Sequence, residues 1–462
     1  MICTIDIKDE VWCIIKGLSK FHNDALQDMF SPYVEGYRHM PLFKLGRWNG
    51  KVSFYEKSGK TYVRLLTRIV PSIENWGYEI ELIDNRKYIE PPALITSKCF
   101  RNTEIELRPY QVQAVNACIN AGSGIVIAGT GAGKTLITAA LSNAYSLAGY
   151  NTITMVPSSD LVTQTADFYQ SVGLDTGIYS GDAKDPHHLN VVATWQSIQN
   201  IPRLLKDFDC ILWDELHGAK AQVAQKLLNE DAAHMIAKFG VTGTFPKPLA
   251  DQLSIHGAIG DILIEITAKW LIDNGYLAEV EIHQICLKQP NKEQFPDYAS
   301  EKAYLVKNSD RMDVIADLII ARCEEYGNTL VLVSSVPFGE KLASLINGAV
   351  FLSGASKKAD RKIQYDTFAE GEDVITIATE GIAKQGISID RVKNFMFIDI
   401  GKSFITTIQG VGRGTRLAHD KRKVFVADVY ADLKWAKKHA KERKRWYAEA
   451  QYPVTQDITI KI

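Results

Sequence analysis

Short runs of apolar residues alternate with longer amphipathic stretches over most of the chain. In a first series, we expect strands at 124–128, 152–156, 190–193 and 210–213. In a second series, which begins near residue 310, we expect strands at 329–334, 349–352, 374–378, 394–398 and 423–427. Stretches of helical periodicity separate these runs, and strands that alternate with helices are typical of parallel sheets covered on both faces. The pattern therefore predicts two α/β domains in tandem.

The first ninety or so residues follow a different pattern, in which short strand-like pieces alternate. Two of these pieces, 51–55 and 61–66, flank Gly59 and Lys60, and we expect a hairpin with its turn at that dipeptide. The pair Pro91-Pro92 indicates a linker, because proline ends regular structure and restricts the residue before it.

These patterns divide the chain into five segments. We expect a small β-rich α+β domain over 1–92, a first α/β domain over 93–248, a connecting segment over 249–305, a second α/β domain over 306–430, and a basic helix and tail over 431–462. The division agrees with the length of 462 residues, which exceeds what one hydrophobic core usually supports.

Composition adds mainly exclusions. The net charge of −1 gives no global sign of a nucleic-acid partner, so any such signal must be local. The seven cysteines are scattered without a C-x-x-C pair, which argues against a disulfide framework and a zinc site and favours the reducing cytoplasm. No apolar stretch approaches the length of a membrane span, so we expect no membrane partner.

A glycine-rich segment between a predicted strand and a predicted helix carries the strongest chemical signal. Its residues are Ala128, Gly129, Thr130, Gly131, Ala132, Gly133, Lys134 and Thr135. Glycines let backbone N–H groups converge on a phosphate, and the helix N-terminus adds favourable dipole charge. Lys134 would reach the β- and γ-phosphates, and the Thr135 hydroxyl would ligate Mg²⁺. The alternative is a glycine turn ahead of a core helix.

A pair of carboxylates follows the strand 210–213. Asp214 and Glu215 lie about 80 residues after Lys134, where a second Mg²⁺ ligand is expected at the end of a parallel strand. We predict that Asp214 holds the metal and that Glu215 orients and deprotonates the attacking water. An isolated Asp-Glu pair is otherwise typical of a solvated turn.

Two arginines of the second α/β domain are candidates for stabilising charge on a transferred phosphoryl group. Arg413 and Arg416 are three residues apart, which places both on one helix face, and Gln409 precedes them. A solvated basic helix is the alternative.

The motifs together resemble superfamily 2 helicases. The glycine loop and Asp214-Glu215 occur in that family's order with Gln111 of Arg108-Pro109-Tyr110-Gln111, Thr242-Gly243-Thr244 and the segment 409–416. Pro157 with Leu161 and Gln164, Thr194-Trp195-Gln196, and the stretch from Ala378-Thr379-Glu380-Gly381 to Gly386-Ile387-Ser388 fill the remaining positions. Leu216 departs from the common D-E-A-H and D-E-C-H forms, and we interpret it as a tolerated variation.

The resemblance implies two tandem RecA-like domains that bind ATP and Mg²⁺ between them and step along one nucleic-acid strand. It implies that Gln111 reads the adenine edge and that Thr242 and Thr244 couple hydrolysis to domain movement. The implied nucleotide contacts besides the glycine loop are Arg108, Gln111 and Gly386. The implied strand contacts are Pro157, Ser158, Gln164, Thr194, Trp195, Gln196, Ser334, Thr379, Glu380 and Gly381.

The N-terminal domain is locally basic. From Gly36 to Arg68 it has eight lysines or arginines and one acid, Glu56, with aromatic residues between them. This pattern suits phosphate contacts and base stacking, with these candidates: Arg38, Lys44, Arg47, Trp48 and Lys51. The alternative is a small domain with an aromatic core and solvated lysines. The stretch 36–51 resembles the N-terminal domain of phage UvsW-type recombination helicases, which implies branched or forked DNA as the partner.

Two further questions stay open. The basic run from Lys434 to Arg445 suits either a helix that tracks duplex DNA or a solvated helix. For the whole chain, an ATP-dependent helicase that remodels branched DNA is the leading hypothesis. The alternatives are a translocating subunit of a restriction or transcription-coupled repair machine, and a nucleotide-switched DNA clamp.

Overall fold

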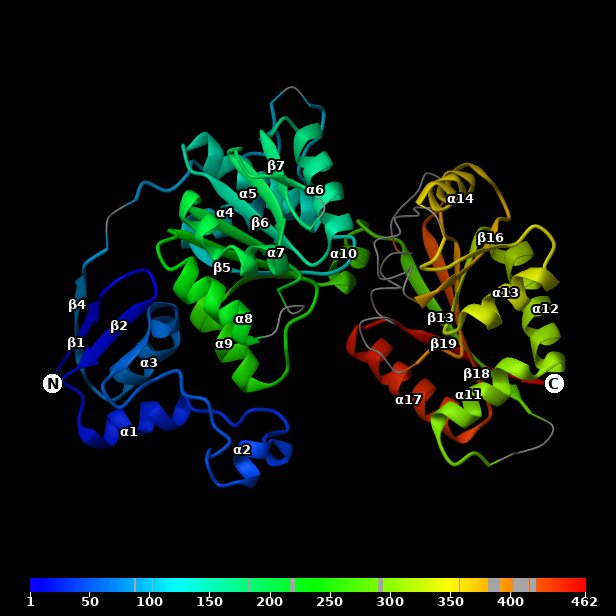
Figure 1. Cartoon of the computed structure of the whole chain (residues 1–462), viewed down its shortest axis with the longest axis horizontal. Coiled ribbons are helices and arrows are strands. Elements are labelled where there is room, and N and C mark those ends of the chain that lie inside the picture. The colour runs from blue at the N-terminus through cyan, green and yellow to red at the C-terminus, as the bar shows by residue number, and fades with distance from the viewer. Residues whose placement is uncertain are drawn as a thin grey trace. The chain divides into compact units, whose positions relative to one another are not determined.

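The computed structural model describes the chain except residues 87–88, 102, 182, 217–220, 290–293, 357, 381–390, 402–414 and 416–420 (Figure 1). The described residues form two compact units. The first comprises 1–129 and 133–266, and the second comprises 267–462 with the three residues 130–132.

The N-terminal part of the first unit is a small α+β domain. Its sheet has the order β3-β2-β1-β4, from strands β1 (Ile2–Ile7), β2 (Trp12–Lys16), β3 (Lys60–Tyr62) and β4 (Glu79–Asp84). The helices are α1 (Lys20–Met29), the short α2 (Pro41–Lys44), the 3-10 turns η1 (Tyr37–His39) and η2 (Val63–Leu65), and α3 (Leu66–Asn75). Apolar side chains of α1 and α3 pack against β1 and β2 to form one core.

The hairpin predicted at Gly59 is only partly correct. Gly59 does occupy a turn, with φ of 80°, and Tyr55 pairs with Thr61 across it. Residues 51–55, however, form isolated bridges rather than a strand, and the chain enters η2 directly after Tyr62. The apolar residues of 63–66 face the core from helical turns, which the local alternation of residues did not reveal.

The rest of the first unit is a RecA-like α/β domain. Its sheet has the order β12-β5-β11-β10-β6-β9-β7-β8, and among the described strands every pairing except β7–β8 is parallel. The strands are β5 (Ser123–Ala128), β6 (Thr152–Val156), β7 (Thr176–Tyr179), β8 (Lys184–Asp185), β9 (Asn190–Thr194), β10 (Cys210–Asp214), β11 (Ala237–Thr242) and β12 (Ile262–Ile266). Every residue of β6, β9 and β11 is buried, which requires cover on both faces.

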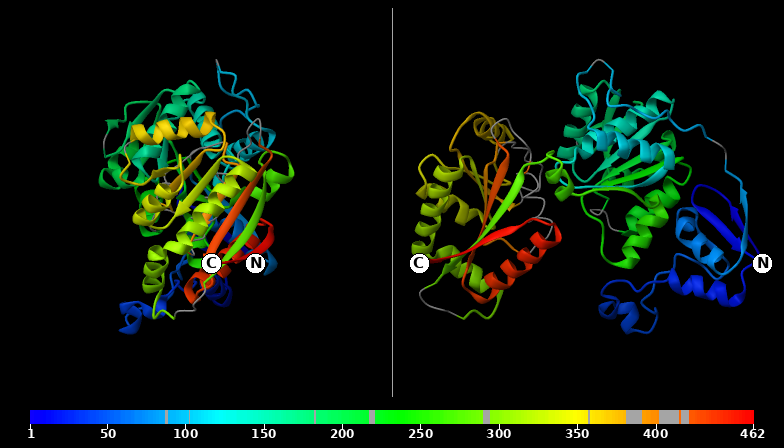
Figure 2. Two further views of the ribbon diagram at one scale, coloured as in Figure 1. Left: turned by 90° about the vertical axis from the view of Figure 1, so that its right-hand side faces the viewer. Right: turned by 180° about the vertical axis from the view of Figure 1, so that it is seen from behind.

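Helices supply that cover (Figure 2). They are α4 (Pro109–Ala121), α5 (Lys134–Leu147), α6 (Ser159–Ser171), α7 (Trp195–Asn200), α8 (Ala221–Lys226) and α9 (Leu249–Ile259), with the 3-10 segment η3 (Pro202–Asp207) and the π-helical turn η5 (Leu227–Asp231). Residues 89–107, around the predicted linker at Pro91-Pro92, contain no regular element where they are described.

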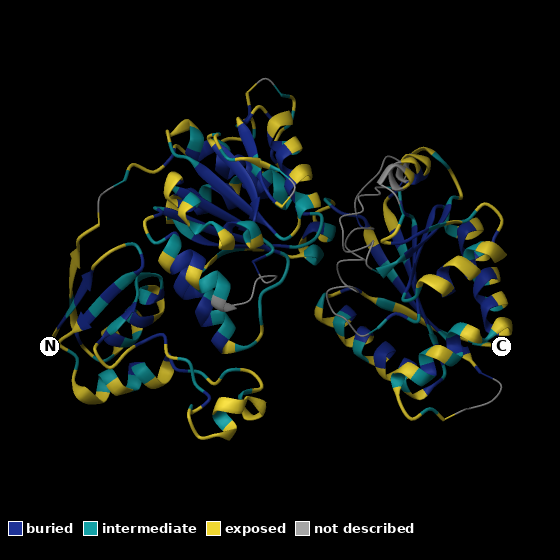
Figure 3. Cartoon of the chain, viewed as in Figure 1, coloured by how far each residue is buried: buried dark blue, intermediate teal, exposed yellow. Residues whose placement is uncertain are grey.

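The second unit contains another parallel sheet, of order β15-β16-β14-β17-β18-β13-β19. Its strands are β13 (Glu279–Lys288), β14 (Thr329–Val333), β15 (Val350–Leu352), β16 (Ile375–Thr379), β17 (Asn394–Ile398), β18 (Lys423–Ala431) and β19 (Val454–Lys461). Its helices are α10 (Ala268–Asp273), α11 (Tyr298–Lys307), α12 (Ser309–Tyr326), α13 (Val336–Leu345), α14 (Lys358–Glu370) and α17 (Lys434–Glu449). In both sheets the strands are mostly buried and the helices expose one face (Figure 3).

The fold class is thus as predicted, but two of the expected segments hold elements of the α/β domains. The expected connecting segment 249–305 holds α9 and β12, which belong to the first domain because β12 pairs with β5. It also holds β13, which pairs with both β18 and β19 and lies inside the second sheet. The expected C-terminal tail likewise supplies a strand, β19, rather than an appendage to the domain.

Candidate ATPase site and nucleic-acid interface

Three neighbouring strands of the first sheet bring the predicted ATP-site residues together. β5, β11 and β10 are adjacent and parallel, so they end at one edge of the sheet. The glycine loop (Ala128–Thr135) follows β5, Asp214 ends β10 and Thr242 ends β11. Segments after the carboxyl ends of parallel strands are where nucleotides bind in such folds. We refer to this as the carboxyl edge of the first sheet.

Lys134 and Glu215 form an ion pair at the carboxyl edge. The distance from Lys134 Nζ to Glu215 Oε1 is 2.8 Å, and both side chains are largely buried. The second carboxylate oxygen of Glu215 lies 3.4 Å from the Thr242 hydroxyl and accepts from the Gly243 N–H at 3.5 Å. A Cβ atom at Gly243 would lie 3.3 Å from Lys134 Nζ. The three motifs therefore contact one another directly.

The backbone at Glu215 adopts an uncommon conformation. Its φ is 51°, in the left-handed region that residues other than glycine rarely adopt. The Glu215 N–H donates to the Val241 carbonyl at 2.9 Å and lies 3.0 Å from Asp214 Oδ1. These contacts hold the strained turn, and such strain is characteristic of functional sites.

The two neighbouring carboxylates, Asp214 and Glu215, favour a bound cation. Burial raises the pKa of Asp214 above its ordinary value, and the nearby Glu215 carboxylate raises it further, whereas Lys134 lowers it. Two carboxylates thus share one ammonium group. A divalent cation at this position would offset the excess negative charge and keep Asp214 ionised.

The residues present fit Mg²⁺ better than a metal held by protein alone. Among the residues that the structure describes, no group of three or more His, Cys, Asp or Glu side chains is placed to hold a metal. Mg²⁺ is usually held by one or two protein oxygens together with waters and substrate phosphates. Asp214 and Thr135, at the start of α5, are donors of that kind.

Gln111 lies beside the glycine loop. It is buried in the first turn of α4, where its Oε1 accepts from the Arg108 N–H at 2.9 Å. A Cβ atom at Gly133 would lie 2.4 Å from Gln111 Nε2, so this position requires glycine, as its φ of 79° also does. Arg108 contacts the Tyr110 hydroxyl at 3.3 Å. The first turn of α4 is therefore packed against the loop that would hold phosphates.

The residues of the first domain that are predicted to contact a nucleic-acid strand follow β6 and β9, the next two β-strands along the carboxyl edge. Ser158 caps α6 after β6, and Thr194 caps α7 after β9. Gln196 donates to the Pro157 carbonyl at 3.2 Å and joins the two segments. Gln164 and Gln196 are exposed, and Trp195 is partly exposed. The sheet edge thus divides into a half with the phosphate-loop motifs and a half with polar helix starts, where Ser158 and Gln196 are exposed and Thr194 is buried.

In the second domain, the described candidates also share an edge. Ser334 follows β14, Thr379 ends the adjacent parallel strand β16, and Glu380 follows it. Five other predicted residues lie outside the described residues: Gly381, Gly386, Gln409, Arg413 and Arg416. Their roles stay predictions from the sequence.

The basic residues of the N-terminal domain separate into two groups. Arg38, Lys44 and Arg47 are exposed on the segment 33–50 around η1 and α2. Lys51 lies 3.5 Å from Asp28 and above the Tyr33 ring, and the Trp48 indole N–H donates to the Lys51 carbonyl at 2.7 Å. Lys51 and Trp48 therefore fix the conformation of the segment 33–50.

Two arginines counted in the basic stretch contact the motor domain. Arg64 is partly buried and donates to Ser123 Oγ at 3.1 Å, and Arg68 forms an ion pair with Asp261 at 2.8 Å. In the C-terminal helix, Arg443 is buried against Asp428 at 2.6 Å, whereas its neighbour Lys444 is about half exposed. A count of charges in sequence could not distinguish these arginines from solvated ones.

Comparison with known proteins gives the site its context. The family model described as "Type III restriction enzyme, res subunit" matches residues 104–247, and "DNA helicase UvsW, N-terminal" matches residues 19–84. The ATP-dependent DNA helicase uvsW of Enterobacteria phage T4 is 26% identical to this chain over 94% of each protein. The chain therefore resembles UvsW-type helicases of superfamily 2 in both its N-terminal segment and its motor segment. Its activity is that of an ATP-dependent DNA helicase.

More distant relatives share the motor domains. The DNA 3'-5' helicase XPB of Kineococcus radiotolerans is 27% identical, over 75% of this chain and 63% of the relative. The DNA-bound Type ISP restriction-modification enzyme LlaBIII has a TM-score of 0.60 at 14% identity, over 86% of this chain and 34% of that chain. At such identity the likeness concerns the fold. None of the described helices is long and apolar enough to cross a membrane.

Proposed function

We propose that this helicase remodels branched DNA in recombination, repair and replication, by fork regression, Holliday-junction branch migration and unwinding of D- and R-loops. The observation that carries the proposal is an exposed basic and aromatic segment on a domain that packs against the motor. The similarity to the ATP-dependent DNA helicase uvsW of phage T4 along nearly the whole chain supports DNA as the substrate of the motor.

In the motor, Lys134 would neutralise the β- and γ-phosphates of ATP, and Mg²⁺ would bind Thr135 and Asp214. Lys134 would exchange its partner Glu215 for phosphate oxygens when ATP binds, since it is paired with that carboxylate in the structure. Glu215 would then be released to accept a proton from the attacking water. Arg413 and Arg416 would stabilise the developing charge, with Gln409 beside them, and Arg108, Gln111 and Gly386 would complete the nucleotide contacts.

One strand of DNA would contact the polar half of the carboxyl edge of the first sheet. The exposed residues after β6 and β9, which include Ser158 and Gln196, offer hydroxyl, amide and backbone groups to a phosphate backbone. Ser334 and Thr379 offer equivalent groups in the second domain. Contacts of this kind position a strand without reading its sequence, as a translocating enzyme requires.

The segment 33–50 is suited to the branch itself. It exposes three basic side chains, Arg38, Lys44 and Arg47, and Glu35 is its only acid. It also exposes two apolar side chains, Leu42 at 56% and Leu45 at 65%. Exposed apolar groups bordered by polar residues are characteristic of interaction surfaces. Phosphates would pair with the basic residues, while unstacked bases at a junction would contact the apolar and aromatic ones.

Replacing Lys44 and Arg47 together with alanine is expected to weaken binding to a forked DNA about ten-fold at low salt. The slope of log Kd against log salt concentration should fall by about two, because each lost phosphate contact lowers the number of counterions released on binding by about one. Binding of a linear duplex should change less, because the motor contacts are intact. Fluorescence-anisotropy titrations of both DNAs over a series of salt concentrations measure these quantities.

The matched control replaces Lys20 and Lys57 with alanine. Both are exposed lysines of the same domain outside the segment 33–50. It removes the same charge and should leave the fork preference unchanged. If the control shifts the salt slope as much as the Lys44 and Arg47 variant, the basic residues act only as solvated charge and the proposed role of the segment is wrong.

A restriction or repair translocase is less well supported. The restriction-subunit model matches only the motor segment 104–247, whereas the N-terminal domain matches the UvsW-type model over 19–84.

A further inference from the structure

The N-terminal domain and the first RecA-like domain share one packing element, helix α9. Leu253 of α9 belongs to the core of the N-terminal domain and is 4% exposed. The Tyr62 ring lies against Gly257, where a Cβ atom would come within 3.1 Å of the ring. Because α9 contributes a residue to the other domain's core, a displacement of the N-terminal domain must move or strain this helix.

A polar contact extends this interface toward the ATP site. Arg68 of α3 donates to Asp261 Oδ1 at 2.8 Å, and its Nη2 lies 3.0 Å from His256 Nε2. His256 Nδ1 lies 2.8 Å from the Gly260 carbonyl. The carbonyl can only accept, so Nδ1 carries the proton and Nε2 accepts from Arg68. Burial lowers the pKa of His256, which agrees with this neutral form.

The other side of His256 faces the segment that leads out of the catalytic edge. The ring centroids of His256 and Phe245 are 5.2 Å apart. Phe245 follows Thr242-Gly243-Thr244, whose Thr242 hydroxyl contacts both Glu215 and the Thr244 carbonyl. A continuous series of contacts thus joins Arg68 of the N-terminal domain to Glu215, through His256, Phe245 and Thr242.

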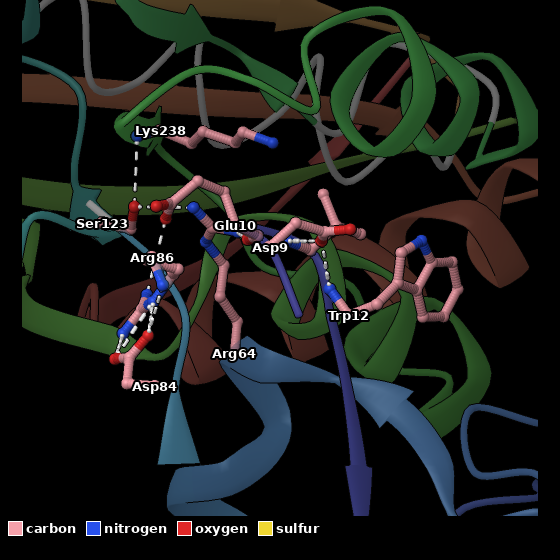
Figure 4. Close-up of polar contacts among 9 residues, drawn as sticks. Asp9, Glu10, Trp12, Arg64, Asp84, Arg86, Ser123 and Lys238 are labelled. Atoms are coloured by element: carbon pink, nitrogen blue, oxygen red, sulfur yellow. Dashed lines mark hydrogen bonds and ion pairs between the residues drawn. The ribbon is translucent and has the colours of Figure 1, made fainter. Parts of the chain in front are cut away.

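A second group of contacts joins the N-terminal domain to the start of β5, at the edge of the sheet opposite the carboxyl edge (Figure 4). Arg64 reaches from η2 to Ser123, the first residue of β5, and also donates to the Glu10 carbonyl. The Ser123 hydroxyl accepts from the Lys238 N–H at 3.2 Å. Burial lowers the pKa of Arg64 to about 10, so its guanidinium is charged at neutral pH.

We propose that Arg68 and His256 are positioning residues that transmit DNA engagement by the N-terminal domain to the hydrolytic site. The transmission runs through α9 and the segment 242–248, which sets where Thr242 holds the Glu215 carboxylate. The inference rests on the proposed function, since it requires the N-terminal domain to bind DNA. The contact series would adopt one arrangement with DNA bound and another without it, and ATP would be hydrolysed at a different rate in each.

The test compares Arg68→Ala with Arg86→Ala in the full chain. Arg86 is the matched control because it lies in the same domain, pairs with Asp84 and Glu10, and has a side chain 32% exposed against 40% for Arg68. Both variants lose one positive charge. The quantities measured are ATPase without DNA, the Kd for a forked DNA, and kcat at saturating forked DNA.

For Arg68→Ala we expect stimulation of kcat by the fork to fall at least five-fold, with DNA-free ATPase and Kd within two-fold of the wild type. Arg86→Ala should keep the wild-type stimulation. His256→Gln, which retains a donor and an acceptor, should keep more stimulation than His256→Leu. A loss of DNA-free ATPase in parallel with stimulation would indicate a purely structural role.

The outcomes separate the two proposals. If the wild type is stimulated by the fork and Arg68→Ala behaves like Arg86→Ala, the inference is wrong and the proposed function stands. If no DNA stimulates the wild type, the proposed function itself is wrong, and the inference falls with it.

Discussion

Replacing Lys134 with alanine should abolish ATP turnover and leave DNA binding without nucleotide within about two-fold of the wild type. Lys134 is the one described cation that the structure places beside both Glu215 and Gly243, where the γ-phosphate would lie. Loss of such a charge from a largely buried site is expected to lower kcat/KM by about 10³-fold, or about 4 kcal/mol of transition-state stabilisation.

The measurement is steady-state phosphate release with saturating DNA, together with a DNA titration without nucleotide. Lys206→Ala is the control, since Lys206 is an exposed lysine of the same domain in η3. A variant at Lys134 that hydrolyses ATP within ten-fold of the wild type would refute its assignment to the phosphates. A parallel loss of DNA binding would instead indicate misfolding.

Replacing Glu215 with glutamine is expected to separate ATP binding from hydrolysis. The amide cannot accept the proton of the attacking water, so we expect a loss of about 10²- to 10⁴-fold in turnover. The ion pair with Lys134 is also removed, and Lys134 no longer has to leave a carboxylate before it meets phosphate. ATP should therefore bind as tightly as in the wild type or more tightly.

Single-turnover hydrolysis and equilibrium binding of a fluorescent ATP analogue measure the two effects. Glu230→Gln serves as the control, because Glu230 is an exposed glutamate in η5 of the same domain, outside the strands that carry the ATP motifs. Wild-type turnover in Glu215→Gln would show that another group is the general base, and weaker ATP binding would contradict the competition between carboxylate and phosphate.

The strands that the sequence predicted are those with continuous apolar runs. β5, β6, β9 and β10 in the first domain, and β14 to β18 in the second, all lie where such runs predicted them. Two of the strands that were missed, β11 and β13, have polar residues at buried positions. β11 holds the buried Lys238, whose Nζ donates to the Leu228 carbonyl, and β13 holds the buried His283 and Gln284. Partners distant in sequence satisfy these groups, and no local pattern reveals them.

The candidate site shows the same limit. The glycine loop and Asp214-Glu215 could be predicted because each needs particular residue types at a strand end, and the order of β5, β11 and β10 brings them together. The direction of a charged side chain could not be predicted. Arg64 and Arg68 follow the same basic pattern as Lys44 and Arg47, yet they contact Ser123 and Asp261. Only the packing of η2 and α3 on α9 decides this difference.

Strand exchange on a synthetic four-way junction tests the central claim most directly. With ATP and Mg²⁺, the wild type should convert a mobile junction into its paired duplex products, faster than it unwinds a linear duplex of equal length. Omission of ATP, or the Lys134→Ala variant, should leave the junction intact. If the junction is left unchanged while linear DNA or an RNA duplex is unwound, the motor is a helicase whose work is not the remodelling of branched DNA.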